Sequence, residues 1–106
     1  MGQEINLDDL FQHFDQLGDT EVILDVRQPD EYSSGHIKGS INIAHDEVGD
    51  MVDELKKYSK IYIHCKAGGR ARKAFSTLEA LGFENLVCIV DAGMDEWINR
   101  GYPVER

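Results

Sequence analysis

A cysteine followed by two glycines and several cations stands out as the chemical signal of this chain. Cys65 ends an apolar run in the stretch 62–74, YIHCKAGGRARKA, and four of the nine residues after it are Lys or Arg. A cationic setting at a helix N-terminus favours the thiolate over the thiol, and the thiolate is the nucleophilic form of cysteine. A lone cysteine is by default a small buried hydrophobe, but the glycine pair and the cations reverse that expectation. We therefore predict that Cys65 is a catalytic nucleophile.

The residues after Cys65 are suited to binding an anion next to the sulfur. Only four residues separate Cys65 from Arg70, and two of them are adjacent glycines, which permit unusual backbone dihedral angles. Such a turn points successive N–H groups inward and forms an anion-binding nest. The predicted substrate-binding residues of this loop are Lys66, Ala67, Gly68, Gly69 and Arg70.

The spacing between cysteine and arginine discriminates between two chemistries. Cysteine phosphatases have the spacing C-x5-R, in which the longer loop encircles a tetrahedral phosphate, whereas Cys65 and Arg70 give C-x4-R. A loop one residue shorter has a tighter mouth, which suits a single extra sulfur atom better than a phosphoryl group. The spacing therefore favours sulfur chemistry over phosphate chemistry.

The other candidate ligands and nucleophiles favour structural roles. Cys88 lies inside the apolar run LVCIV and is predicted to belong to the core. His64 adjoins Cys65, but strand alternation turns the two side chains to opposite faces. The histidines have no metal-type spacing among themselves or with the cysteines. We expect no metal site and no organic cofactor; the histidines concerned are His13, His36, His45 and His64.

Hydrophobic periodicity predicts alternating helices and buried strands. Apolar residues recur at helical spacing in the segments 7–17, 48–58, 71–81 and 94–98. Apolar runs of strand type occupy 22–26, 41–44, 61–65 and 86–90, and the segment 27–40 is rich in turn formers. This alternation predicts an α/β domain with a mainly parallel sheet between helices. It also places Cys65 at the carboxyl end of a strand, where sheets of this type bind ligands.

Length, composition and charge narrow the possible functions. A chain of 106 residues with 42% apolar residues is long enough for one compact domain and too short for two. A net charge of -9 argues against nucleic-acid binding, yet seven of the eleven Lys and Arg residues and no acidic residue fall within 55–78. An anionic ligand is therefore expected at that place. No stretch could span a bilayer, and two isolated cysteines fit a reducing compartment, so a cytoplasmic location is expected.

Three segments in order resemble the rhodanese family across nearly the whole chain. LDVRQPDEYSSGHIKGSINI, residues 24–43, resembles the family's D-V-R-x-x-x-E-[FY]-x-x-G-H-I-x-G-[AS]-x-N-[IV] segment. HCKAGGRA resembles its C-x-x-G-x-R loop, and DAGMDEWINRGYPVE resembles its closing G-G-x-x-x-W…G-x-P segment. The departures are Ala92, where glycine is frequent, and Lys66, where arginine is frequent; lysine keeps the charge but loses the bidentate fork.

The resemblance implies a single rhodanese domain over residues 1–106, with a three-layer sandwich of about five strands and helices on both faces. It also implies a thiosulfate sulfurtransferase in which the Cys65 thiolate takes a sulfur from a small anionic donor and passes it, as a persulfide, to cyanide or a thiol. By the same resemblance, Arg27 together with Lys66 would bind the donor. Asp25 would orient Arg27 or the loop, or would be a satisfied carboxylate at a strand end.

Three other functions remain open beside this one. A sulfur-relay carrier would exchange the persulfide with a protein donor or acceptor, with thiosulfate only a surrogate. Relatives with the longer loop are phosphatases or arsenate reductases, and the arginine spacing disfavours both here. A catalytically silent interaction module is disfavoured by the intact cysteine, glycines and cations. None of these functions involves nucleic acid or a membrane.

Overall fold

Five parallel strands form one sheet at the centre of the computed structural model, which describes residues 3–89 and 92–106. The strands are β1 (Gln3–Ile5), β2 (Glu21–Asp25), β3 (Ile41–Asn42), β4 (Lys60–His64) and β5 (Leu86–Ile89). Their order is β1-β5-β4-β2-β3, and each of these neighbouring pairs is parallel. The predicted α/β class with a mainly parallel sheet of about five strands is confirmed.

The central strands are apolar on both faces because helices cover both sides of the sheet. Every residue of β2 and β4 after the first is buried. The register pairs Asp25 with His64, so the carboxyl ends of β2 and β4 lie side by side. The loops that follow these two strands, including the one after Cys65, therefore meet at the same edge of the sheet.

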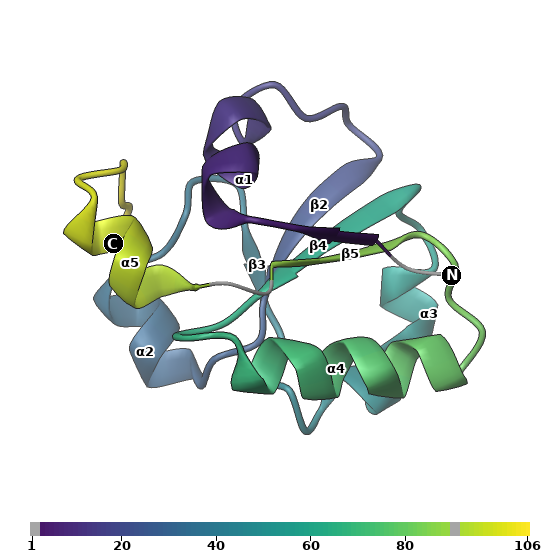
Figure 1. Ribbon diagram of the computed structural model, residues 1–106. Coiled ribbons are helices and arrows are strands. Elements are labelled where there is room, and N and C mark those ends of the chain that lie inside the picture. Colours follow the sequence, from purple (N-terminus) through teal and green to yellow (C-terminus); the bar gives the residue numbers. More distant parts are fainter. Residues whose placement is uncertain (1–2, 90–91) are drawn as a thin grey trace.

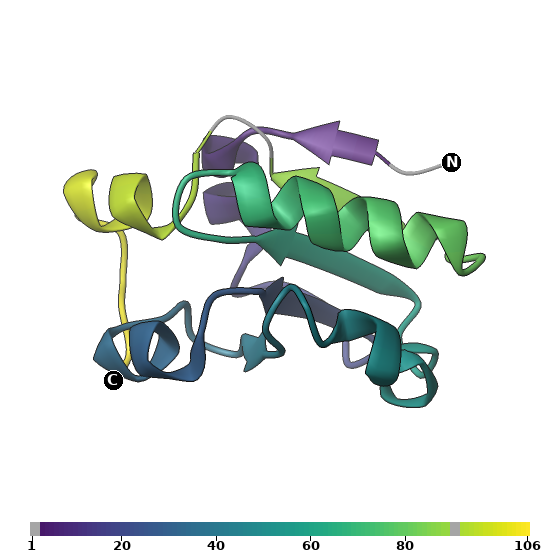
Figure 2. The same cartoon turned by 90° about the horizontal axis from the view of Figure 1, so that it is seen from below.

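Helices on each face complete the three layers (Figure 1). On one face, α1 (Leu7–His13) and α5 (Met94–Asn99) pack over one apolar cluster; on the other, η1 (Val48–Asp50), α3 (Val52–Leu55) and α4 (Gly69–Ala80) pack over a second cluster. Figure 2 shows α2 (Pro29–Ser34) and α5 near the end of the sheet where α4 begins. The stripe of α4 predicted from the sequence is buried through Ala71, Ala74 and Leu78.

Two predicted helices are shorter than their apolar spacing suggested. The helix predicted over 7–17 ends at His13, although Phe14 and Leu17 still pack against the core beneath α1. The helix predicted over 48–58 is divided into η1 and α3. Gly49, a weak helix former, lies in the 3₁₀ turn, where a Cβ would come 3.7 Å from the side chain of Thr77. In both segments apolar contacts with the sheet persist without a continuous helix.

Two elements were not predicted. β1 has only three residues with little burial, so it carries no apolar pattern. α2 was predicted as loop, because none of its six residues is buried and it lacks an apolar stripe. Its signals are Pro29 in the first turn and a capping box between Gln28 and Glu31. Strand β5 ends at Ile89 among the described residues, and the remainder of the predicted strand, Val90, lies outside them.

Candidate active site

Cys65 lies between the end of β4 and the loop 66–69 that leads into α4. Its Sγ accepts a hydrogen bond from the backbone N–H of Gly68 at 2.9 Å, and the residue is only 1% exposed. Gly68 has φ 120°, a conformation that residues with a Cβ rarely adopt, whereas Gly69 begins the helix without a positive φ. One glycine of the pair therefore turns the amide toward the sulfur, and the other starts the helix.

The start of α5 holds the outer side of this loop. The N–H of Met94 donates to the carbonyl of Cys65 at 2.8 Å, and the N–H of Asp95 donates to the carbonyl of Lys66 at 3.3 Å. Gly93 permits this approach, because a Cβ there would lie 2.0 Å from the Cys65 carbonyl oxygen. Main-chain hydrogen bonds from the start of α5 thus hold the loop in place. Sequence reasoning did not identify Gly93 as part of the site.

Arg70 connects the loop to α2. Its guanidinium makes a bidentate ion pair with Glu31, with Nη1–Oε1 and Nη2–Oε2 distances of 2.6 and 3.0 Å. The hydrogen bonds from Arg70 hold the pKa of Glu31 at about 2, below its ordinary value of 4.5. The sequence pointed to Arg70, but its partner lies in the segment that was predicted as loop. The capping-box signal at Gln28 and Glu31 could have placed that carboxylate on a helix.

The ion pair predicts a stability difference that depends on pH. At pH 7 we expect Glu31→Gln to lower the free energy of unfolding by about 1–2 kcal/mol, because both groups are about three-quarters buried and only partly screened. A lowered carboxyl pKa contributes stability above the unfolded value, and this contribution is lost as the pH falls through the folded value. The difference should therefore disappear between about pH 4.5 and about pH 2. Urea titrations across this range measure it, and an equal difference at pH 2 and pH 7 would contradict it.

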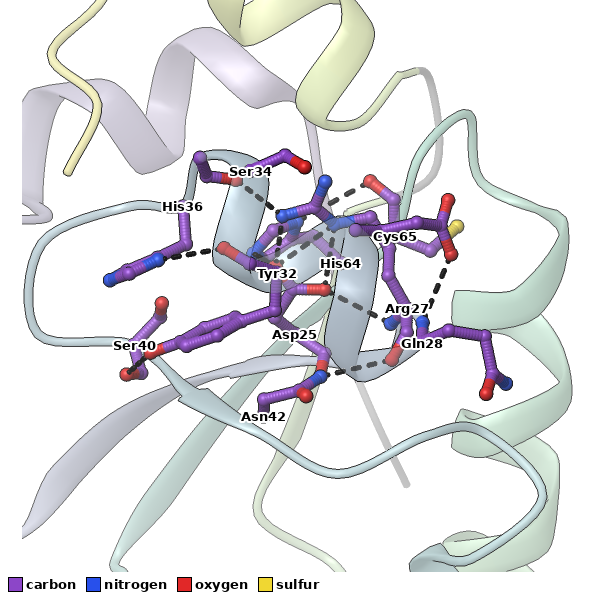
Figure 3. Close-up of polar contacts among 12 residues, drawn as sticks. Asp25, Arg27, Gln28, Tyr32, Ser34, His36, Ser40, Asn42, His64 and Cys65 are labelled. Atoms are coloured by element: carbon purple, nitrogen blue, oxygen red, sulfur yellow. Dashed lines mark hydrogen bonds and ion pairs between the residues drawn. The ribbon is translucent and has the colours of Figure 1, made fainter. Parts of the chain in front are cut away.

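Asp25, Arg27 and His64 form a buried polar group next to the site (Figure 3). Arg27 donates from Nη2 to Asp25 Oδ2 at 2.7 Å and to the Gly35 carbonyl at 2.7 Å, and from Nε to both carboxylate oxygens at 3.0 Å. Asp25 therefore contacts Arg27, one of the two partners considered for it. Burial lowers the pKa of His64, whose Nε2 lies 3.9 Å from Asp25 Oδ2.

The structure brings most of the predicted site residues together around Cys65. Lys66, Ala67 and Gly69 are exposed, Gly68 is buried, and Arg70 is partly buried. A pocket of about 270 Å³ beside the loop is lined in part by Lys66 and Ala67. Arg27 is 6% exposed and makes the contacts within the protein described above. The assignment of Arg27 to donor binding stays a prediction.

The second cysteine has different surroundings. Cys88 lies in β5, is 2% exposed and packs in the core, and burial raises the pKa of its thiol to about 11. Within residues 3–89 and 92–106, no group of three or more His, Cys, Asp or Glu side chains is arranged to hold a metal ion. Over the same residues, no helix has the length and apolar character that crossing a bilayer requires.

Comparison with known proteins identifies the family. The model of the rhodanese-like domain matches residues 7–100, and the chain belongs to this family. The crystal structure of a rhodanese-related protein from Thermoplasma volcanium is 35% identical and superimposes with a TM-score of 0.82 over 97% of both chains. A structure from Staphylococcus saprophyticus is 30% identical, with a TM-score of 0.80 over 98% of this chain and 99% of that one. The rhodanese-like fold is confirmed.

Curated relatives are named for sulfur chemistry. YrkF of Bacillus subtilis, described as a proposed sulfur carrier protein, is 35% identical over 97 residues, which are 92% of this chain and 51% of YrkF. The chain thus spans about half the length of that relative. The thiosulfate sulfurtransferase GlpE of Pseudomonas entomophila is 30% identical over 84 residues, which cover 79% of this chain and 75% of GlpE. The family and these relatives support a general role in sulfur transfer.

Proposed function

We propose that this protein is a sulfurtransferase that carries a sulfane sulfur as a persulfide on Cys65. The observation that carries the proposal is the 2.9 Å hydrogen bond from the Gly68 N–H to the Cys65 sulfur, at the carboxyl end of β4 and the start of α4. A main-chain donor and a helix N-terminus both stabilise negative charge on sulfur. The same electrostatic setting suits the anionic outer sulfur of a persulfide.

The reaction proceeds in two displacements. The Cys65 thiolate attacks the outer sulfur of thiosulfate, a new S–S bond forms, and sulfite leaves with the electron pair of the bond that breaks. Cyanide or a thiolate then attacks the outer sulfur of the persulfide, and Cys65 departs as a thiolate, ready for another cycle. Both steps are displacements at sulfur, so neither needs an external oxidant or reductant. Neither step as written requires a metal or an organic cofactor.

The surrounding residues have distinct roles in this scheme. Lys66 is an exposed cation of the loop and attracts the sulfonate end of the donor, and the Gly68 N–H donates to the reacting sulfur. Arg70 holds the loop through Glu31 and adds positive potential. Asp25 orients Arg27 through their buried ion pair at the end of β2.

Steady-state kinetics with thiosulfate and cyanide test this proposal. We expect production of thiocyanate, with parallel double-reciprocal lines when both substrates are varied, because donor and acceptor react in separate steps through a covalent intermediate. An aryl phosphate serves as the control substrate, since the C-x4-R loop should not accommodate a phosphoryl group. Intersecting lines would exclude the two-step scheme, and release of phosphate without thiocyanate would replace it with phosphatase activity.

A second candidate is relay of the sulfur between proteins, favoured by the similarity to YrkF, whose description is that of a proposed sulfur carrier. In that case the persulfide would load faster from a protein persulfide than from thiosulfate. Single-turnover loading rates from the two donors, measured at equal concentrations, separate this role from turnover of small molecules.

A further inference from the structure

The surface above Cys65 is formed by the loop and by the first turns of α4. Cys65 is 1% exposed, so an acceptor thiol reaches the sulfur only by approaching across residues that lie at the surface. These include Lys66, Ala67 and Gly69 in the loop, and Arg72 and Lys73 in the first turns of the helix. An acceptor larger than cyanide therefore contacts a cationic surface before it meets the sulfur.

Two hollows lie beside this surface. The pocket of about 270 Å³ between the loop and α5 includes Lys66, and a groove of about 500 Å³ between α4 and the segment after β3 includes Arg72 and Lys73. Asp95 and Glu96 also line the pocket, where Glu96 pairs with Arg100, and Asp46 lines the groove, so each hollow has acidic side chains beside its cations. A ligand that contacts the cations of both hollows lies across the start of α4. A peptide segment is long enough to do this, whereas a small thiol is not.

The cations of this surface differ in their partners within the protein. No carboxylate of the described residues forms an ion pair with Lys66 or Lys73, and Arg72 lies 3.9 Å from Glu4, with both side chains more than half exposed. Such an exposed pair contributes little and leaves the guanidinium accessible to water. In contrast, Arg70 is committed to Glu31. We define Lys66, Arg72 and Lys73 as the cationic face.

The rest of the chain repels an acidic partner. All twenty Asp and Glu residues, and only four of the eleven Lys and Arg residues, lie outside 56–73. Opposite charge steers encounter and suppresses wrong orientations, whereas like charges facing each other oppose binding. An acidic segment would therefore be directed to the cationic face and away from the remaining surface.

We propose that the physiological acceptor is a protein whose reactive thiol lies in an acidic segment that docks on the cationic face. This inference rests on the proposed function and names the class of its acceptor. The thiolate of the segment attacks the outer sulfur of the Cys65 persulfide, and the S–S bond to Cys65 breaks. Cys65 leaves as a thiolate, and the outer sulfur, with any proton it carries, becomes the persulfide of the partner.

Single-turnover transfer to two synthetic peptides tests the inference. Each peptide has one cysteine, flanked by glutamates in one and by lysines in the other, and both react with protein first loaded by thiosulfate and freed of excess donor. The ratio of their rate constants is compared between the wild type and Lys73→Glu, which cancels the different intrinsic reactivities of the two thiols. We expect this acidic-to-basic ratio to fall about 10-fold in the variant, and to fall in the wild type as salt is added.

The matched control is Lys56→Glu, which makes the same charge change at an exposed residue beside the far end of α4. An unchanged ratio in Lys73→Glu, or an equal fall in Lys56→Glu, would overturn the inference, because the preference would then not depend on the cationic face. The mass of the protein before the peptides are added reports loading. A protein that fails to load overturns the proposed function and this inference together, whereas a loaded protein with an unchanged ratio overturns this inference alone.

Discussion

Replacement of Cys65 with serine is expected to lower kcat/KM for thiosulfate by about 10³-fold or more, because the nucleophile of both steps is lost. A serine hydroxyl remains protonated at neutral pH and cannot hold a sulfane sulfur as a persulfide. Burial should be unaffected, since the side chain is nearly the same size and lies in the same 1% exposed position. The measurement is thiocyanate formation, with thermal unfolding of the variant as the check on folding.

Cys88→Ala is the matched control for that variant. The Cys88 thiol is buried in β5, and burial raises its pKa to about 11, so it contributes almost no thiolate at neutral pH. We expect this substitution to lower the free energy of unfolding by about 1 kcal/mol through loss of core packing, and to leave kcat/KM within about two-fold. Activity that survives in Cys65→Ser and disappears in Cys88→Ala would show that Cys88, and not Cys65, is the nucleophile.

Gly93→Ala is expected to disrupt the active site through the main chain of the loop. The added Cβ would lie 2.0 Å from the Cys65 carbonyl oxygen and 2.6 Å from the carbonyl carbon and oxygen of Lys66. These are main-chain atoms, so the loop must move away from α5 and lose the hydrogen bonds donated by Met94 and Asp95. We expect a loss of about 3 kcal/mol in the free energy of unfolding and about 10²-fold in kcat/KM, since small displacements of a nucleophile are costly.

Gly18→Ala is the control for the added methyl group. No atom lies within 4 Å of a Cβ built at Gly18, and its φ is outside the left-handed region. Its free energy of unfolding should therefore be equal to that of the wild type or slightly higher. Denaturant unfolding and initial rates measure both variants. A Gly93→Ala protein with wild-type stability and activity would show that the contact between α5 and the loop does not position Cys65.

The elements that carry the nucleophile were predictable because they are buried on both sides. The apolar runs of β2, β4 and β5 and the stripe of α4 follow from burial in the core, so their order placed Cys65 at a strand end before a helix. α2 was missed for the opposite reason: none of its residues is buried, so only capping residues marked it.

The contacts between residues far apart in the sequence could not be predicted from the sequence pattern. The charge of Arg27 was evident, but its hydrogen bonds to Asp25 and to the Gly35 carbonyl depend on how the chain folds back after α2. The Glu31–Arg70 ion pair joins two segments that are far apart in the sequence. The close approach of Gly93 to the Cys65 carbonyl likewise requires α5 to meet the loop. Residue types therefore predicted the chemistry, whereas the contacts that hold the loop required the fold.

The mass of the protein after brief exposure to thiosulfate tests the central claim most directly. We expect the addition of one sulfur atom, located on the peptide that contains Cys65 and removed on addition of cyanide with formation of thiocyanate. The peptide that contains Cys88 should gain no mass. An unmodified Cys65 under conditions in which thiosulfate is consumed, or sulfur found only on Cys88, would exclude a persulfide on Cys65 as the intermediate.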